Sequence, residues 1–198
     1  MAVRPVRTIG DPVLRSVAEP VRTFDQEGRD ELRTLIRDMV ETMHDVQGVG
    51  LAAPQIGVGL RVFVYDADGQ QGYVVNPSLT VGDQPQDGAE GCLSVPGVGY
   101  PTPRADYAQV TGFTATGEPI TVEGTGLLAR CLQHECDHLD GMLYVDRLRG
   151  AVKKQAMQAI RHRQYSDVVA EVQGKRRDSL ASGRGSSFGQ PGITGGTA

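Results

Sequence analysis

The first clear pattern along the chain is a run of hydrophobic residues at helical spacing after Asp25. These side chains recur at the i, i+3, i+4 and i+7 positions of one helix face, at Leu32, Leu35, Ile36, Met39, Val40 and Met43. Asp25 is a residue type that caps helix N-termini, and Gly48 and Gly50 interrupt the helical pattern. The sequence therefore predicts a helix from Asp25 to about Asp45, followed by a loop.

The pattern then changes to short runs of apolar and β-branched residues. Such runs are typical of strands, and the glycine, proline, asparagine and aspartate residues between them are typical of turns. Five runs fit this description: residues 61–65, 73–75, 79–81, 109–114 and 120–122. The alternation of short runs with turn residues predicts antiparallel strands.

Helical spacing returns near residues 124–126 and ends by Gly141. His134 and His138 fall on one face of this second helix, and an adjoining face carries Leu128, Cys131, Leu132, Glu135 and Leu139. A third helix is expected from about Ala151 towards Val172.

The composition changes after residue 173. The last 25 residues contain seven glycines and four serines, with few large apolar side chains. A segment of this kind buries too little surface to offset the entropy lost on ordering. We therefore expect a single folded domain over residues 1–173 and a disordered tail over residues 174–198.

Length and charge place the chain among ordinary globular proteins. It has 198 residues, of which 39% are hydrophobic and 22% charged, and its formal net charge is −4. This acidic balance argues against a general or sequence-specific nucleic-acid-binding surface. No apolar run approaches the roughly 18 residues that cross a bilayer, and no signal peptide is visible. These features predict a cytoplasmic protein without membrane contact, and its three cysteines form no disulfide pattern.

The second helix contains the segment His134-Glu135-Cys136-Asp137-His138. Histidines at i and i+4 project from the same helix face, where both imidazoles can bind one metal ion. Glu135 can reach water at that ion and act as a general base. The pattern fixes only three positions, and an exposed helix with two histidines and two acids needs no metal. Glu135 falls on the apolar face, however, where a carboxylate is costly unless it has a partner.

A catalytic zinc-like site needs a third protein ligand. Downstream of the motif only His162 remains, in a helix expected to be amphipathic and exposed. Upstream, Cys92 lies in the turn-rich segment 90–96. Most free cysteines are small buried hydrophobic residues, and this interpretation fits Cys131 and Cys136 and applies to Cys92 as well. The residues alone therefore leave the third ligand open.

Three segments, taken in order, resemble the peptide deformylase family in its bacterial form. They are Gly48-Val49-Gly50-Leu51-Ala52-Ala53-Pro54-Gln55, Glu90-Gly91-Cys92-Leu93-Ser94 and Gln133-His134-Glu135-Cys136-Asp137-His138-Leu139-Asp140-Gly141. The likeness extends from residue 11 to about residue 147. It implies an α+β fold in which antiparallel β-sheets pack around a central helix carrying the His-Glu-x-x-His motif, with a further C-terminal helix.

The resemblance also implies a metal site. Cys92, His134 and His138 would hold one divalent metal ion. The ion is commonly Fe(II) in bacterial relatives, and Zn, Ni or Co can occupy the same ligands.

The activity that the resemblance implies is hydrolysis of the N-formyl group from formylmethionine at the start of new polypeptides, with release of formate. Glu135 would carry the proton in this reaction. The Gln55 side-chain amide and the Leu93 backbone N–H would stabilise the charge that develops on the formyl oxygen. The backbone of Gly50 would contact the substrate, because glycine permits close approach.

The methionine side chain of the substrate requires an apolar pocket. By resemblance, the wall of this pocket contains Leu127, Arg130 and Cys131, with Glu90 nearby. Arg130 replaces an apolar residue found in many relatives. We therefore expect its alkyl stem to line the pocket and its guanidinium to reach solvent.

Two charged residues are expected near the site. Arg104 either pairs with Glu90 and holds the Cys92 loop, or is an ordinary surface arginine. Asp137 either accepts a hydrogen bond from a ligand histidine or a backbone group, or is exposed. Cys136 is expected to pack in the core.

Partners and rival functions complete the expectations. Because deformylases act on chains leaving the ribosome, the C-terminal helix or basic tail could contact the ribosome; the alternative is a solvated tail. One rival function is a zinc metallopeptidase with another third ligand, which would cleave internal peptide bonds. Another is a non-catalytic ribosome-associated protein, which predicts loss of the metal ligands or of Glu135, yet these residues are present.

Overall fold

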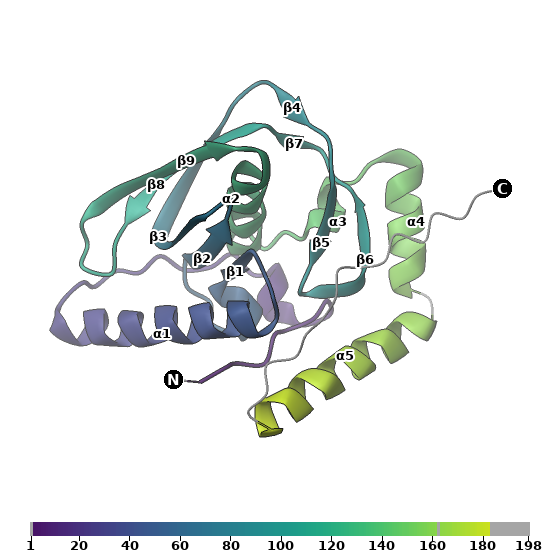
Figure 1. Ribbon diagram of the computed structural model, residues 1–198, viewed down its shortest axis with the longest axis horizontal. Coiled ribbons are helices and arrows are strands. Elements are labelled where there is room, and N and C mark those ends of the chain that lie inside the picture. The colour runs from purple at the N-terminus through teal and green to yellow at the C-terminus, as the bar shows by residue number, and fades with distance from the viewer. Residues whose placement is uncertain (1, 162, 183–198) are drawn as a thin grey trace.

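The computed structural model describes residues 2–161 and 163–182 (Figure 1). The main sheet is antiparallel, with the order β1-β2-β3-β8-β9: Gly50–Ala52, Val62–Ala67, Gln70–Val81, Tyr107–Phe113 and Pro119–Thr125. Two small sheets pair β4 with β7 and β5 with β6: Pro85–Gln86, Arg104–Ala105, Ala89–Cys92 and Val95–Pro101. The helices are η1 Pro12–Arg15, α1 Gln26–Asp45, η2 Ala53–Ile56, α2 Gly126–Leu139, α3 Tyr144–Arg147, α4 Gly150–Arg161 and α5 Arg163–Ser182.

Helix α2 stands between the main sheet and the two small sheets (Figure 1). One hydrophobic core joins it to β2, β3 and β8 through Phe63, Tyr65, Val74, Ala108, Val110, Leu128, Leu132 and Leu139. Every residue of α2 from Leu128 to Leu139 is buried. The predicted α+β fold, with antiparallel sheets around a central helix that carries the motif, is therefore confirmed.

Strand β2 is covered on both faces. Phe63 and Tyr65 face the core that contains α2, whereas Val62 and Val64 face a second core that contains α1. Side chains alternate between the two faces of a strand, so a continuous apolar run is required when both faces are buried. This strand is therefore the layer shared by the two cores.

Helix α1 confirms the first periodic pattern. Its N-cap residue is Asp25, whose carboxylate accepts a hydrogen bond from the Gly28 backbone N–H at 2.9 Å. The helix ends at Asp45 and buries Leu32, Ile36, Met39 and Met43. These residues cover the face of β2 opposite to α2.

Strand β3 differs from the prediction because it joins two runs that the sequence separates. Its pairing with β8 shifts register between Val75 and Ser78, which marks a β-bulge. Asn76 has a φ of 50° at this point. Its side chain accepts a hydrogen bond from the Val21 N–H and donates one to the Val21 carbonyl, at 2.8 and 2.9 Å. The residues that indicated a turn therefore form a bulge held by a distant segment.

The start of α2 is held by carboxylates from other elements. The N-cap residue Thr125 makes no side-chain capping bond. Instead, the Asp68 carboxylate accepts from the Leu128 N–H at 3.1 Å, and the Asp106 carboxylate accepts from the Gly126 N–H at 3.3 Å. Asp68 lies in the tight turn between β2 and β3. These contacts fix the N-terminus of α2 relative to the main sheet.

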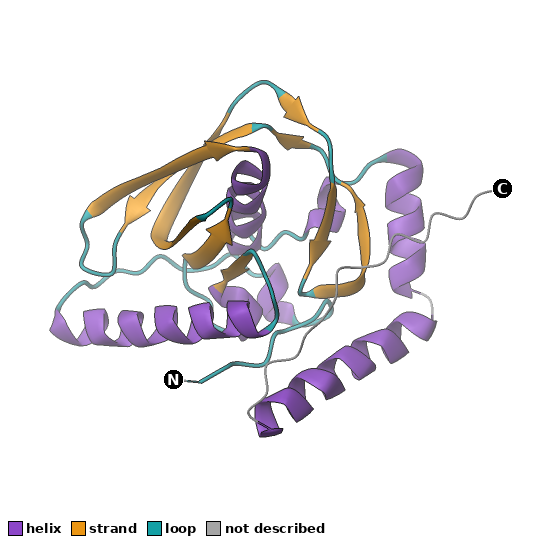
Figure 2. Ribbon diagram, in the orientation of Figure 1, coloured by secondary structure: helices purple, strands orange, loops and turns teal. Residues whose placement is uncertain are grey.

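All elements after β9 are helical (Figure 2). The third predicted helix is in fact two helices, α4 and α5, which run in different directions (Figure 1). Helix α5 continues to Ser182, which corrects the expectation of disorder for residues 174–182. Residues 183–198 of the expected tail lie outside the described residues, and the domain boundary at residue 173 stays a prediction.

The C-terminal helices pack beside the β5–β6 sheet. A third core joins them through Val95, Leu143, Tyr144, Val145, Leu148 and Ala156. From α5, the Arg176 guanidinium donates to the Leu93 carbonyl at 3.3 Å. None of the helices in the described part of the chain is both long and apolar enough to cross a membrane.

Candidate active site

The two motif histidines lie one turn apart on α2, with their Nε2 atoms 3.1 Å apart. Strand β5 ends at Cys92, which places its Sγ atom 3.3 Å from His138 Nε2. One ligand atom from each of these three residues lies within 4.8 Å of the other two. The structure thus brings together the three residues that the resemblance implies as ligands, although Cys92 is 42 and 46 positions from the histidines.

The chemistry of this group fits a divalent metal ion. His134 Nδ1 lies 2.5 Å from Glu90 Oε1, so the Glu90 carboxylate favours the tautomer that leaves the Nε2 lone pair facing Cys92 and His138. The Cys92 sulfur accepts hydrogen bonds from the Ser94 N–H at 3.4 Å and from Gln55 Nε2 at 3.9 Å. A thiolate with two neutral imidazoles is a common ligand set for late first-row metals. The other candidate ligand, His162, lies outside the described residues.

Glu90 is the centre of a buried network of charges. The Arg104 guanidinium binds both of its carboxylate oxygens, at 2.9 and 2.7 Å, and Arg130 Nη1 binds Oε2 at 3.1 Å. Burial opposes ionisation of Glu90, but the hydrogen bonds from Arg104 and His134 outweigh it and hold its pKa well below the usual range. Glu90 is therefore a carboxylate at neutral pH.

The network extends from Arg104 to Asp137 and Arg147. Arg104 is only 6% exposed and also donates to Asp137 at 2.7 Å, which confirms the predicted pairing with Glu90 and excludes a surface arginine. Asp137 is buried and accepts from Arg147 as well. The side-chain partners of Asp137 are thus Arg104 and Arg147. The carboxylate that contacts His134 Nδ1 is that of Glu90. Nothing in the sequence pattern indicated the part played by Arg147.

The expectation that the guanidinium of Arg130 reaches solvent is wrong. The residue is 7% exposed, and its guanidinium points inward to Glu90 and to the Thr102 carbonyl. A buried carboxylate within reach forms charge-assisted hydrogen bonds with a guanidinium and so stabilises it away from solvent. The nearby carboxylate comes from β5, a strand that the sequence did not predict.

Glu135 follows His134 on α2 and faces the Gly50 position of β1. It is 3% exposed, and its Oε2 atom has no hydrogen-bond partner among the described residues. Burial raises the pKa of Glu135 to about 7. Its carboxylate is therefore able to gain and lose a proton near neutral pH.

Gly50 lies against this carboxylate. A Cβ atom at Gly50 would be 2.4 Å from Glu135 Oε1 and 2.7 Å from Cys131 Sγ. Cys131 itself donates a hydrogen bond from its thiol to the Val49 carbonyl at 3.2 Å. Strand β1 and helix α2 therefore approach at a distance that only glycine allows at this position.

Gly50→Ala is expected to displace Glu135 and to reduce the formate release that the resemblance implies by about 100-fold, since shifts of an ångström at a reacting group have effects of this size. Overpacking should also cost roughly 1–3 kcal/mol of unfolding free energy. Steady-state rates and urea unfolding measure the two effects. Gly59→Ala is the matched control, because a Cβ there meets nothing within 4 Å. An unchanged rate in Gly50→Ala would contradict the close approach.

Gln55 is held in one orientation on η2. Its Oε1 atom accepts from the Ala52 N–H at 2.8 Å, which turns its amide nitrogen toward Cys92 and Ser94. Leu93 lies in the turn between β5 and β6, and a Cβ at Gly48 would approach its side chain at 3.0 Å. The three resemblance segments thus meet at one place. Ser94, the partner of Gln55 at 3.2 Å, was not singled out, although it ends the second segment.

The expected pocket residues separate into two sets. Leu127, Cys131 and Glu135 follow one another at i, i+4 spacing, and Gly50 lies against the last two. Leu127 is 43% exposed at the start of α2, whereas Cys131 is buried. Arg130 and Glu90 take part in the charge network. Cys136, on α2, packs in the core that α2 shares with the main sheet, as predicted.

A buried helix with the His-Glu-x-x-His motif, a convergent cysteine and an unpaired glutamate define a metal-dependent hydrolase. Comparison with known proteins then gives the family. The model of the polypeptide deformylase family matches residues 3–154. The peptide deformylase of Acidothermus cellulolyticus is 58% identical over 172 residues, covering 87% of this chain and 93% of that protein.

Solved structures agree with this match. A peptide deformylase from Legionella pneumophila is 44% identical, with a TM-score of 0.72 over 79% of this chain and 92% of that chain. A peptide deformylase from Synechococcus elongatus, solved in complex with actinonin, is 36% identical, with a TM-score of 0.71 over 81% and 91%. The chain belongs to the polypeptide deformylase family, and it is an enzyme that removes the N-formyl group from new polypeptides. This result replaces the metallopeptidase and non-catalytic alternatives.

Proposed function

We propose that Cys92, His134 and His138 hold the metal of this deformylase, and that the formyl group of N-formylmethionyl peptides is hydrolysed beside them. The observation that carries the proposal is the buried Oε2 atom of Glu135, one position after His134, which has no hydrogen-bond partner in the part of the chain that the structure describes. A buried carboxylate oxygen without a partner is costly, and a water molecule or substrate N–H in the site supplies that partner.

The cofactor in this proposal is one divalent metal ion, Fe(II) in the cell, which Zn, Ni or Co can replace. When bound, it supplies Lewis-acid chemistry, which lowers the pKa of a water molecule and polarises a carbonyl oxygen. The convergence of the three ligand atoms supports the site, and the ligand set suits several of these ions.

Glu135 carries the proton of the reaction. Its carboxylate accepts a proton from the attacking water and then donates it to the amine that leaves, while formate departs. A group that performs both steps needs a pKa close to the working pH, and burial brings the pKa of Glu135 to about 7. The apolar surroundings that raise this pKa also keep bulk water away from the proton.

Gln55 and Leu93 stabilise the charge that develops on the formyl oxygen. The Gln55 amide already points its Nε2 atom toward Cys92, because Oε1 is held by the Ala52 N–H. The backbone N–H of Leu93 follows Cys92 directly in the β5–β6 turn. Donors fixed before the reaction cost no reorganisation during it, which is the basis of oxyanion stabilisation.

The substrate lies between β1 and α2 in this proposal. Gly50 offers its backbone to the peptide, and the methionine side chain follows the row from Leu127 to Cys131. The partial exposure of Leu127 leaves the entrance of this row open to solvent. An acetyl group carries a methyl where a formyl group has hydrogen, so a closely packed site excludes acetylated chains by clash.

The test is formate release from formyl-Met-Ala-Ser by anaerobically purified protein loaded with Fe(II) or Ni(II), with acetyl-Met-Ala-Ser as the matched substrate. We expect rapid release of formate and no comparable release of acetate. A folded, metal-loaded protein that releases neither would reject the proposed function.

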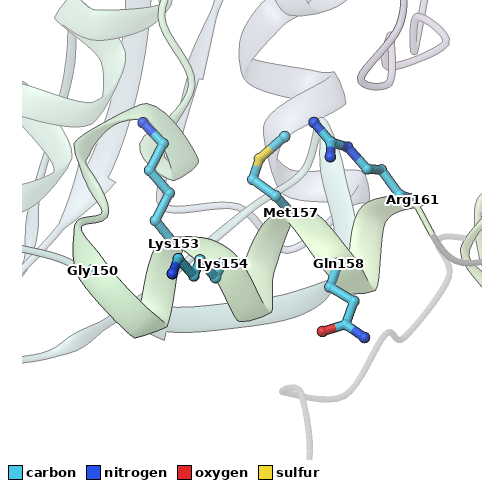
Figure 3. Close-up of a pocket in the computed structure, with 6 residues that line it drawn as sticks. All are labelled: Gly150, Lys153, Lys154, Met157, Gln158 and Arg161. Carbon is cyan, nitrogen blue, oxygen red and sulfur yellow. The ribbon is translucent and has the colours of Figure 1, made fainter.

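The ribosome is the further partner that we propose, in the cytoplasm, through the C-terminal helices. A shallow cavity of about 650 Å³ on α4 is lined by Gly150, Lys153, Lys154, Met157, Gln158 and Arg161, and Figure 3 shows the side chains along this helix. Three cations on one short helix favour a polyanionic partner. Lys153→Glu/Lys154→Glu should weaken co-sedimentation with ribosomes, whereas Arg33→Glu on α1 should not. Equal binding by both variants would reject this contact.

A further inference from the structure

We propose that Arg130 is a positioning residue for His134, acting through Glu90, rather than a contact for the methionine side chain. The inference rests on the proposed function only in taking His134 as a metal ligand. It concerns how the contact between Glu90 and His134 Nδ1 orients the ring of that ligand.

The surroundings of Arg130 all lie on the side of the small sheets. Its Nη1 atom donates to Glu90 Oε2 at 3.1 Å and to the Thr102 carbonyl at 3.0 Å, and its Nε atom donates to Gln86 Oε1 at 3.3 Å. A Cβ atom at Gly88 would lie 3.1 Å from Nη2. These partners come from β4, β5 and the segments next to them.

The geometry of α2 separates this side from the substrate side. Cys131 and Glu135 face Gly50 on β1. The contacts to Glu90 come from Arg130 and His134, and the contact to Arg104 comes from Asp137. These three residues of α2 are at positions i, i+4 and i+7. A guanidinium held among these acids is therefore turned away from the row that faces Gly50.

Glu90 is bound at both oxygens by residues of the same helix. Oε1 contacts His134 Nδ1 and Arg104 Nη2, while Oε2 accepts from Arg104 Nε and Arg130 Nη1. Arg130 and His134 are one helical turn apart, so Arg130 links one end of the carboxylate to α2 and His134 links the other. Without Arg130, only Arg104 on β7 would hold Oε2.

This arrangement gives Arg130 a specific effect on the metal ligand. The direction of Glu90 Oε1 sets the plane of the His134 ring, and hence the direction of the Nε2 lone pair. The Arg130 side chain is 9% exposed and that of Glu90 is 5% exposed, so few alternative arrangements with water are available. Loss of the arginine should therefore loosen metal binding before it alters binding of the peptide.

The experiment uses the full chain loaded with Co(II), and compares Arg130→Met and Arg130→Lys with wild type. Methionine keeps an unbranched apolar stem and removes the guanidinium. We expect Arg130→Met to lose Co(II) to a chelator about 10- to 100-fold faster, as is typical when a group that orients a ligand is removed. Its Co(II) absorption bands should shift, kcat should fall, and KM for formyl-Met-Ala-Ser should stay within about 2-fold. Arg130→Lys should lose Co(II) at a rate between those of wild type and Arg130→Met.

Two further variants test the route through Glu90. Gln86→Ala removes the other side-chain partner of Arg130 and should retain Co(II) as wild type does. In a Glu90→Gln background, Arg130→Met should add less than about 3-fold to the rate of Co(II) loss, since residues of one network are not additive.

The results that would overturn the proposal are equally specific. A raised KM with an unchanged rate of Co(II) loss and unchanged bands would place Arg130 in the substrate pocket. Equal effects of Arg130→Met with and without Glu90→Gln would exclude the route through Glu90. If Arg130→Met does not fold, Arg130→Lys decides, and wild-type Co(II) retention in that variant rejects the proposal. Co(II) loss is read without substrate, so a failure of formate release in wild type would reject the proposed function separately.

Discussion

The Glu135→Gln protein is expected to fold and to bind metal, yet to release formate roughly 100- to 10,000-fold more slowly than wild type. Glutamine has nearly the same shape as glutamate, but it cannot take a proton from water and pass it to the leaving amine. The side chain is buried and lies against the Gly50 position, so a neutral amide fits where the carboxylate was. The measurement is steady-state formate release, with the metal content of each preparation determined beside it.

The matched control is Glu31→Gln, which alters an exposed glutamate of α1 by the same chemical change. This control should keep the wild-type rate. If Glu135→Gln retained a tenth or more of wild-type activity with metal bound, a group other than Glu135 would have to carry the proton.

The same pair of proteins gives a prediction about stability and pH. In the metal-free protein, burial raises the pKa of Glu135 from 4.5 to about 7, so the folded state binds an extra proton between these values. The stability of wild type relative to Glu135→Gln should therefore be highest below pH 4.5 and fall as the pH rises to about 7. Urea unfolding of both metal-free proteins across this range measures the difference. A difference that does not vary with pH would contradict the raised pKa.

The second large effect is expected for Cys92→Ala, which should lose bound metal and formate release together. The thiolate is the only anionic group among the three proposed ligands, and alanine leaves two imidazoles on one helix. We expect metal affinity to fall by more than the roughly 10- to 100-fold typical of residues that only orient a ligand. Metal-to-protein ratios after dialysis, together with formate release, provide the measurement.

Cys136→Ala is the control for this change, because it removes a cysteine of the core beside α2. Burial raises the pKa of the Cys136 thiol to about 12, so this group stays protonated at neutral pH and is a poor ligand. The variant should keep its metal and its activity. A Cys92→Ala protein that retained one metal ion per chain would exclude Cys92 as a ligand.

The parts of the fold with their own periodicity could be predicted from the sequence. Helix α1 followed from apolar residues at helical spacing and from Asp25 as the cap. The motif helix followed in the same way, and the i, i+4 spacing of His134 and His138 placed them on one face. These features depend on residues within a few positions of one another, so local sequence determines them.

Features that depend on distant partners could not be predicted. The bulge in β3 requires Val21 to satisfy Asn76, a pair separated by 55 positions. The β5–β6 sheet is short and rich in glycine, with no alternating pattern to mark it. For the same reason the orientation of Arg130 was wrong, because it depends on Glu90, which that sheet carries.

The candidate site was predicted only in part by the residues themselves. The motif supplied two ligands and the glutamate, but Cys92 became a ligand candidate through resemblance and then through its position 3.3 Å from His138. Arg104 had two equal interpretations, and burial beside Glu90 decided between them. Tertiary structure thus placed the third candidate ligand beside the first two and showed the residues that support them.

The hydrogen bond from Arg176 to Leu93 connects helix α5 to the turn between β5 and β6. The Leu93 carbonyl is occupied by α5, while the N–H of the same residue is the proposed donor to substrate. A shortened protein that lacked α5 would keep the three proposed metal ligands, but it would lose the hydrogen bond from Arg176 to the turn that contains Leu93. We therefore expect removal of α5 to lower turnover with little effect on metal content, because the contact at Leu93 would be lost while Cys92, His134 and His138 would remain.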